Sequence, residues 1–211
     1  MGSDPLTGAK IPDHRLWAAQ VIACLQEYLG PRLAHPLAVW VFDGSDFPKQ
    51  GVKSVGVARQ YCGALGKAAN CQAGVLLSAA LRTASGPRGA AGAALVDKRL
   101  YLPEGWTSDP ARCEAAGVPE AKRQYRAKTD LALEMLRQAR ARGYLSAGWA
   151  AGDDAFGMSP RFRDGLTAAG MQYVLDVPPD TPGWPLLPAW CSPAYHGRGC
   201  PLQPSRGAKS I

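Results

Sequence analysis

The sequence lacks any apolar run that approaches the roughly 18 residues of a membrane-spanning helix. Its first ten residues, Met1 to Lys10, also lack the apolar centre of a secretory signal peptide. Both absences predict a soluble, cytoplasmic protein. With 211 residues, 46% of them hydrophobic, the chain is long enough to bury one well-packed core.

No two cysteines have the CxxC spacing of common metal-binding or redox motifs, and no secretion signal supports disulfide bonds. We therefore expect the thiols to be reduced and mostly buried. The six are Cys24, Cys62, Cys71, Cys113, Cys191 and Cys200.

No carboxylate occurs between Asp46 and Asp97, a stretch that is rich in Lys and Arg, and the net charge of the chain is +7. Such a stretch repels cations and attracts a polyanion. A solvated basic surface is the plain alternative, but the clustering favours nucleic acid over membrane because no basic amphipathic helix accompanies it. The expected nucleic-acid-binding residues are Lys49, Lys53, Arg59 and Lys67 of this stretch, with Lys128 in a second basic cluster.

The first half of the chain predicts one helix and three strands. Apolar residues recur every four positions from Trp17 to Leu29, which indicates a helix that begins near Asp13 and stops at Gly30-Pro31. The apolar run 37–42 predicts a central strand that ends at Asp43 and a turn. Residues 54–62 and 70–80 predict two more strands, so that the three form an antiparallel meander.

The second half alternates helices with strands. Residues 83–127 show no sustained periodicity and predict an irregular insertion. Helices are expected over 129–142 and 159–169, and strands over 146–151 and 172–177. This order predicts an α/β fold with a ribonuclease-H-like mixed sheet flanked by helices. We expect one domain over 13–178, followed by a Pro/Gly-rich basic tail over 179–211.

Two acids occupy matching positions, because Asp43 directly follows the first strand and Asp153 the fourth. Open sheets place their ligand sites at such strand ends. If the two strands are neighbours, both carboxylates could bind one Mg²⁺ or Mn²⁺ ion, which activates water or a 3′-hydroxyl for attack on a phosphodiester. The alternative is that each acid merely begins a turn.

Other patterns carry less weight. Gly63, Gly66 and Lys67 lack the spacing and the Ser/Thr of a phosphate-binding loop. Asp43 and Asp46 are three residues apart, whereas an aspartyl phosphatase places its second acid two residues on. The three histidines have no partners at metal-ligand spacing. The tryptophans, Trp106 and Trp149 among them, could stack on bases, but packing in the core is the commoner role.

Several longer strings resemble the DDE transposases of the insertion-sequence seven-hundred-one group. The first-aspartate region is VFDGSDFPKQG (41–51), followed by SVGVARQYCG (54–63) and GKAANCQAGV (66–75). LYLPEGW (100–106), AGVPE (116–120) and the lysine-bearing KTDLAL (128–133) come next. WAAGDDAFG (149–157) is similar to the second-aspartate segment, and YVLDVP (173–178) to the strand that follows it.

The resemblance implies a metal-dependent enzyme that cuts and joins DNA at transposon ends in the bacterial nucleoid. It implies that Asp43 and Asp153 are the first two catalytic, metal-binding carboxylates, with Mg²⁺ or Mn²⁺ as cofactor. In the family a second acid commonly follows the first aspartate, but here Gly44 does, and Asp46 stands where glycine is usual. Asp46 could partly substitute for that acid.

The family's third carboxylate is a glutamate on a later helix, and this sequence has no glutamate after Glu134. We therefore expect a truncated transposase that is inactive as it stands. One alternative is a non-catalytic remnant that binds DNA or pairs with itself or with an intact transposase. Another is a small-molecule α/β phosphatase, which cleavage of a generic phosphomonoester would reveal.

Overall fold

The computed structural model describes residues 14–82 and 91–182 of the chain. The chain divides into two units, Met1–Pro178 and Pro179–Ile211, and all described helices and strands belong to the first. The helices are α1 (His14–Leu33), α2 (Glu104–Thr107), α3 (Pro110–Ala115), α4 (Lys128–Arg142), α5 (Asp154–Gly157) and α6 (Pro160–Ala168), with 3-10 turns η1 (Gly63–Leu65) and η2 (Glu120–Lys122). The strands are β1 (Val39–Pro48), β2 (Ala58–Cys62), β3 (Lys67–Arg82), β4 (Ala91–Leu100), β5 (Trp149–Gly152) and β6 (Gln172–Leu175).

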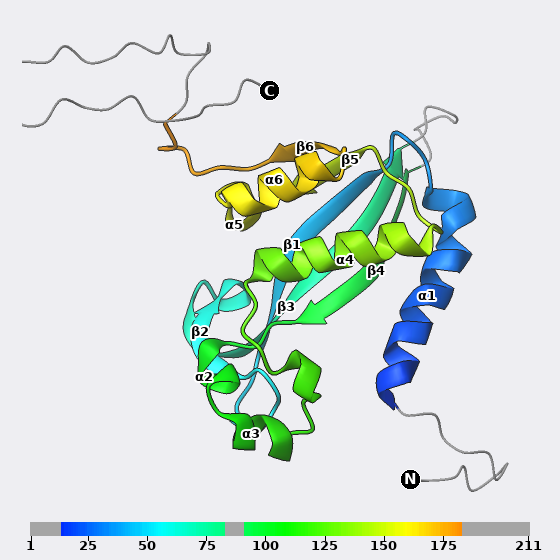
Figure 1. Ribbon diagram of the computed structural model, residues 1–211. Coiled ribbons are helices and arrows are strands. Elements are labelled where there is room, and N and C mark those ends of the chain that lie inside the picture. The colour runs from blue at the N-terminus through cyan, green and yellow to red at the C-terminus, as the bar shows by residue number, and fades with distance from the viewer. Residues whose placement is uncertain (1–13, 83–90, 183–211) are drawn as a thin grey trace, which may run out of the picture. The chain divides into compact units, whose positions relative to one another are not determined.

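The six described strands form one mixed sheet (Figure 1). Strand β1 is antiparallel to β3 on one side and parallel to β5 on the other, and β5 is parallel to β6. The long strand β3 pairs along its other edge with β2 at one end and with β4 at the other, both antiparallel. The predicted α/β class with a ribonuclease-H-like mixed sheet is confirmed.

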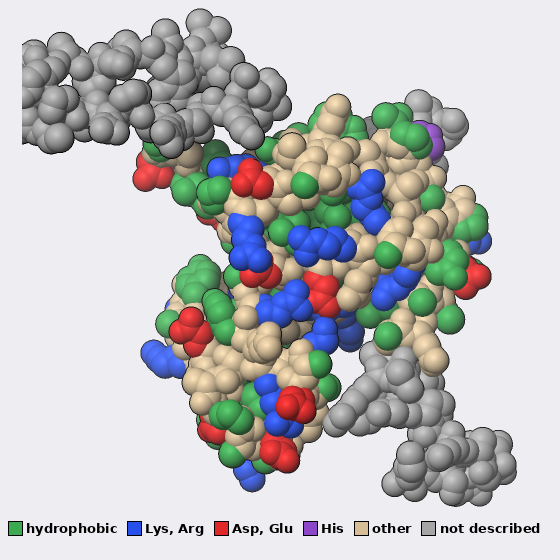
Figure 2. Space-filling model, in the orientation of Figure 1, with side chains coloured by type: hydrophobic (Ala, Val, Ile, Leu, Met, Phe, Trp, Pro, Cys, Tyr) green, Lys and Arg blue, Asp and Glu red, His purple; other side chains and the backbone are tan. Residues whose placement is uncertain are grey.

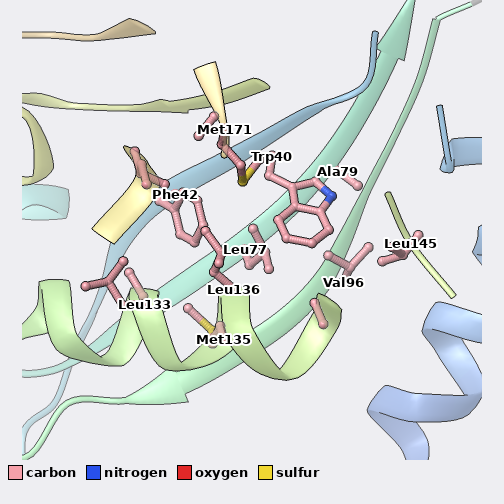
Figure 3. Packing of buried hydrophobic residues seen from close by; sticks show 14 of the residues in the cluster. Trp40, Phe42, Leu77, Ala79, Val96, Leu133, Met135, Leu136, Leu145 and Met171 are labelled. Atoms are coloured by element: carbon pink, nitrogen blue, oxygen red, sulfur yellow. The ribbon is translucent and has the colours of Figure 1, made fainter. Parts of the chain in front are cut away.

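The main core lies between the sheet and four helices. Trp40 and Phe42 of β1 point to the same side as Leu77 of β3, and Met135 of α4 meets them there (Figure 3). Phe42 is fully buried, and its ring packs edge to face against the ring of Phe162, with the two ring centres 5.3 Å apart. Burial of an aromatic side chain of this kind contributes about 1.5–3 kcal/mol. Because α1, α4, α5 and α6 all contribute to this cluster, they cover the same face of the sheet.

Strand β1 is longer than the predicted 37–42. It continues through Asp43 to Pro48, and Gly44 forms a register pair with Val75 of β3 instead of beginning a turn. The sequence Gly44-Ser45-Asp46 is typical of a turn, but pairing with β3 satisfies the backbone N–H and C=O groups of these residues. The predicted meander also differs in order, since β3 and not β2 is the neighbour of β1.

The stretch 83–127 is more regular than predicted. It contains β4, α2 and α3, and Trp106 of α2 is buried in a second small cluster with Val57 and Cys113. The Trp106 Nε1–H donates to the Val57 carbonyl at 2.8 Å, and the Arg112 guanidinium lies 3.8 Å from the centre of the indole ring. The Gly/Ala-rich start of β4 gave no alternating pattern, which is why the sequence did not reveal it.

Helix α1 does not stop at Gly30-Pro31 but runs to Leu33. Among its described residues, Gln26, Gly30 and Leu33 are buried and Leu29 packs against the core, whereas Val21 and Leu25, on the predicted apolar side, are exposed. A Cβ on Gly30 would lie 2.4 Å from the Tyr144 carbonyl oxygen, so this glycine permits a close approach and is not a stop signal.

Among the described cysteines, Cys24, Cys62, Cys71 and Cys113 are free thiols, and the last three are buried. Burial raises the pKa of Cys71 to about 11, helped by a hydrogen bond with Cys62. No helix in the described ranges is long and apolar enough to cross a membrane.

Candidate active site

The register of the parallel strands brings Asp43 and Asp153 side by side. The last register pair between β1 and β5 is Phe42 with Gly152, and each aspartate is the next residue of its chain segment. Neighbouring strands lie about 4.8 Å apart. Because side chains alternate along a strand, Asp43 faces away from the core that buries Phe42. Two carboxylates therefore meet at the carboxyl ends of two parallel strands, as the sequence predicts.

Asp153 is the less exposed member of this pair. Its Oδ1 atom is buried and has no hydrogen-bond partner. Burial raises the pKa of Asp153, and the charges of Asp43 and Asp154 raise it further, while the N–H groups of Phe156 and Ala155 partly offset this rise. The two carboxylates thus repel each other, and the site favours either a proton or a cation.

The segment Gly152-Asp-Asp-Ala-Phe-Gly157 holds Asp153 in place. Asp153 is the residue before α5, and Phe156 of that short helix is buried in the main core. A Cβ on Gly157 would lie 1.8 Å from the Asp176 carbonyl oxygen, so only glycine lets α5 pack against the end of β6. The Asp176 N–H also donates to the Gly152 carbonyl at 3.0 Å. Core packing and backbone contacts therefore fix where Asp153 lies.

Asp46 does not join the pair. It lies three residues beyond Asp43 on the same strand, so it faces the opposite side of the sheet. Its Oδ2 accepts a hydrogen bond from the Gly63 N–H at 2.8 Å, which ties β1 to the turn before β3. The idea that Asp46 replaces a missing acid next to Asp43 is therefore wrong.

The predicted DNA-binding residues lie beyond this pair, toward the end of β1 and around β2. Lys49 follows β1, Lys53 lies in the next loop, Arg59 is on β2 and Lys67 begins β3, and all four are exposed. The Asn70 side-chain amide donates to the Lys49 carbonyl at 2.8 Å, and Asn70 is the register partner of Arg59. These two basic residues are therefore near one another.

Lys128 is the first residue of α4, and its ammonium lies 5.6 Å from the centre of the Tyr101 ring. Burial raises the pKa of Tyr101 to about 12, and its contact with Tyr125 adds to the rise. Lys128 thus contacts an aromatic ring and is half-buried, unlike the exposed Lys49, Lys53 and Lys67.

The weaker sequence patterns have structural explanations. Gly63, Gly66 and Lys67 form the tight connection from β2 to β3, with Gly66 at φ 62°, and not a loop that leads into a helix. Trp106 is a core residue, and Trp149 is 36% exposed on β5. Asp154, which sequence reasoning left without a role, is exposed and acts on the pKa of Asp153.

Comparison with protein families agrees with this geometry. A family model described as DDE superfamily endonuclease matches residues 10–210. The chain belongs to this family. The match includes the Pro/Gly-rich segment after residue 178 as well as both aspartates. No curated protein and no solved structure matches the chain.

DDE superfamily endonucleases act on DNA and generally use divalent metal ions. Carboxylate oxygens are the ligands that Mg²⁺ and Mn²⁺ prefer, and the buried Oδ1 of Asp153 lacks the partner that a cation would supply. The pair therefore fits a divalent ion. Within the described ranges, however, no group of three His, Cys, Asp or Glu side chains could hold a metal ion. What the described residues offer is a two-carboxylate site.

Proposed function

We propose that this DDE endonuclease is an insertion-sequence transposase of the seven-hundred-one group, and that Asp43 and Asp153 bind Mg²⁺ or Mn²⁺ and act on DNA phosphodiesters at transposon ends. The observation that carries the proposal is the register of β1 and β5, which puts both carboxylates at one edge of the sheet. The buried, unpaired Oδ1 of Asp153 supports the metal part of the proposal.

The two aspartates have different tasks in this proposal. Asp43 is exposed and faces away from the core, so it is the carboxylate that a DNA strand approaches. Asp153 is fixed by α5 and by the contact of Gly157 with Asp176, so it sets the geometry of the site. A bound divalent ion would activate the attacking water or 3′-hydroxyl and stabilise charge on the leaving oxygen. Residues 13–178 would form this catalytic core, and 179–211 a basic tail.

We further propose that the chain cuts DNA only slowly, below a useful rate. Two carboxylates leave a second ion held mainly by water, and loss of a comparable electrostatic element from an active site costs about 10²- to 10³-fold in rate. The alternative function is a non-catalytic transposase remnant that binds DNA or forms dimers with itself or with an intact transposase. The absence of a third metal-binding side chain among the described residues favours that alternative.

Cleavage of DNA with Mn²⁺ tests the proposal. Supercoiled plasmid and linear DNA that carries the transposon ends are incubated with the chain, with Asp43→Ala, with Asp153→Ala and with Asp164→Ala. Asp164 is an exposed acid on α6 and serves as the matched control.

We expect slow nicking that both site variants abolish and the control retains. Nicking that persists in Asp43→Ala would refute the assignment of the site. DNA binding without nicking by the parent chain would establish the non-catalytic alternative. Fast end cleavage that depends on Asp43 would show that another group completes the site.

A further inference from the structure

A pocket of about 670 Å³ lies beside β4, the strand that pairs with β3 on the side away from β1. It is bordered by α1, the end of β4, α4 and the segment around residues 116–126. Its volume is within the range of small-molecule sites, about 300–1,000 Å³. Neither Asp43 nor Asp153 lines this pocket, and β3 lies between β1 and β4, so the pocket is separate from the carboxylate pair.

The lining of this pocket is strongly basic. Among the residues that the structure describes, five cationic side chains and one carboxylate, Glu134, line the pocket. A second carboxylate, Asp97, is buried next to it. Figure 2 shows Lys and Arg side chains gathered over the face that α4 covers. The excess of cations favours an anionic ligand. The five are Lys98, Arg99, Lys122, Arg126 and Arg142.

Hydrogen bonds and ion pairs hold three of these cations in fixed positions. The Arg99 guanidinium contacts Asp97 and donates to the Gln138 Oε1 at 2.6 Å. Arg142 donates to the Gln26 Oε1 at 3.2 Å and lies 3.8 Å from the Asp97 carboxylate. Arg126 is paired with Glu134. Such preorganisation lowers the entropic cost of binding.

Two lysines remain available to a ligand. Lys98 is exposed and makes no side-chain ion pair with the described residues. The Lys122 ammonium lies 3.1 Å from Glu134, and the Lys122 side chain is 54% exposed. Glu134 keeps Arg126 and Gln138 as partners if Lys122 turns away. A phosphate bound at either lysine would therefore leave no buried charge unpaired.

Apart from Gln124 and Gln138, the other described lining residues are apolar or glycine. Ile22 of α1, Leu100 at the end of β4 and Leu131 of α4 line the pocket, with Val118 on the far side. Leu100 is 43% exposed. An apolar wall of this kind accepts a flat ring, and a cationic rim accepts a phosphate attached to it.

We propose that this pocket binds one nucleotide of a single DNA strand, with the base against the apolar wall and the phosphate at Lys98 and Lys122. A duplex is too wide to enter a pocket of this volume, whereas an unpaired or extruded nucleotide is not. The proposal shares with the proposed function only the identity of the partner as DNA. It does not require cleavage at the aspartate pair.

The proposal is tested by measuring, with fluorescence anisotropy at low salt, how the chain binds a labelled deoxythymidine 12-mer and a hairpin duplex. Lys98→Gln with Lys122→Gln removes the two phosphate contacts, and Ala19→Trp fills the pocket from α1 without changing its charge. The matched controls are Arg137→Gln and Ala141→Trp, two exposed positions of α4 that do not line the pocket. Thermal unfolding of each variant checks that it folds.

We expect both pocket variants to bind the single strand at least about tenfold more weakly than the parent does, and the controls to bind it as the parent does. Duplex binding should change much less, and thymidine monophosphate should compete better than inorganic phosphate. Unchanged binding in Ala19→Trp, equal losses for strand and duplex, or equal competition by phosphate would each overturn the proposal. Asp43→Ala should bind the single strand normally, so failure of the cleavage test would leave this result unaffected.

Discussion

Asp43 and Asp46 lie on the same strand but face opposite sides of the sheet. Asp43 meets Asp153 at the carboxyl end of the parallel pairing, whereas Asp46 accepts a hydrogen bond from the Gly63 backbone. Two acids that are close in sequence therefore serve different purposes. One is available to a cation, and the other holds the turn between β2 and β3.

This difference predicts how the two acids affect metal binding. Asp43→Asn should abolish binding of Mn²⁺ measured by calorimetry, because it removes one of the two charged ligands. Asp46→Asn should leave Mn²⁺ binding intact and should lower stability by about 0.5–1.5 kcal/mol, since it weakens the hydrogen bond to Gly63. Equal loss of Mn²⁺ binding in both variants would show that Asp46 reaches the site after all.

The pKa of Asp153 predicts a pH dependence of stability. Because burial and the neighbouring charges raise this pKa, the folded protein takes up the proton at a higher pH than the unfolded chain does. The charged form of Asp153 therefore opposes folding at neutral pH, and this opposition disappears as the pH falls through the raised pKa.

Without metal, Asp153→Asn should thus raise the unfolding temperature at pH 7 by at least about a degree. The gain should shrink at acidic pH, as the pH falls through the raised pKa of Asp153 and the parent residue becomes protonated. Thermal unfolding in the presence of a chelator measures both effects, with exposed Asp164→Asn as the control. A gain that is the same at both pH values would argue against the titration of Asp153 as its cause.

The carboxylate pair could be predicted because its signal is local. Each aspartate directly follows a short run of apolar or small residues, and such runs identify buried strands whatever the rest of the fold does. The sequence left open whether the two strands are neighbours, and the parallel pairing of β1 with β5 shows that they are. The fixed position of Asp153 could not be predicted, because it depends on a contact between Gly157 and Asp176 that no local sequence pattern indicates.

Other features depend on pairing across the sheet and were not predictable. The sequence predicts a turn at Gly44-Ser45, yet β1 continues to Pro48 and pairs with β3 along this whole stretch. The first residues of β4 are glycine and alanine, which show no alternation of apolar and polar side chains. In α1 the buried side includes the polar Gln26, which donates to the Val96 carbonyl at 3.0 Å, so apolar positions alone do not identify that side.

Gly157 and Gly44 provide a matched test of how the site is held. Gly157→Ala would place a Cβ 1.8 Å from the Asp176 carbonyl oxygen, so the backbone must shift. We expect a loss of about 1–3 kcal/mol in urea unfolding and weaker Mn²⁺ binding, because α5 carries Asp153 with it. A Cβ on Gly44 meets no atom within 4 Å, so Gly44→Ala should fold with unchanged or slightly higher stability. If Gly157→Ala is as stable as Gly44→Ala, the contact between α5 and β6 does not position the site.

The basic residues around β2 predict the salt dependence of duplex DNA binding. Lys49, Lys53, Arg59 and Lys67 are exposed in a part of the chain that has no carboxylate after Asp46. Each of these residues that contacts a phosphate releases counterions when DNA binds. Each replacement by Gln should therefore reduce the steepness of the slope of log binding constant against log salt concentration by about 0.9. Lys128→Gln should act similarly but also lower stability slightly, because Lys128 contacts the Tyr101 ring. Gel shifts at several salt concentrations measure the slope, with exposed Arg137→Gln as the control. A slope that is unchanged when all four residues are replaced would place the duplex on another surface of the protein.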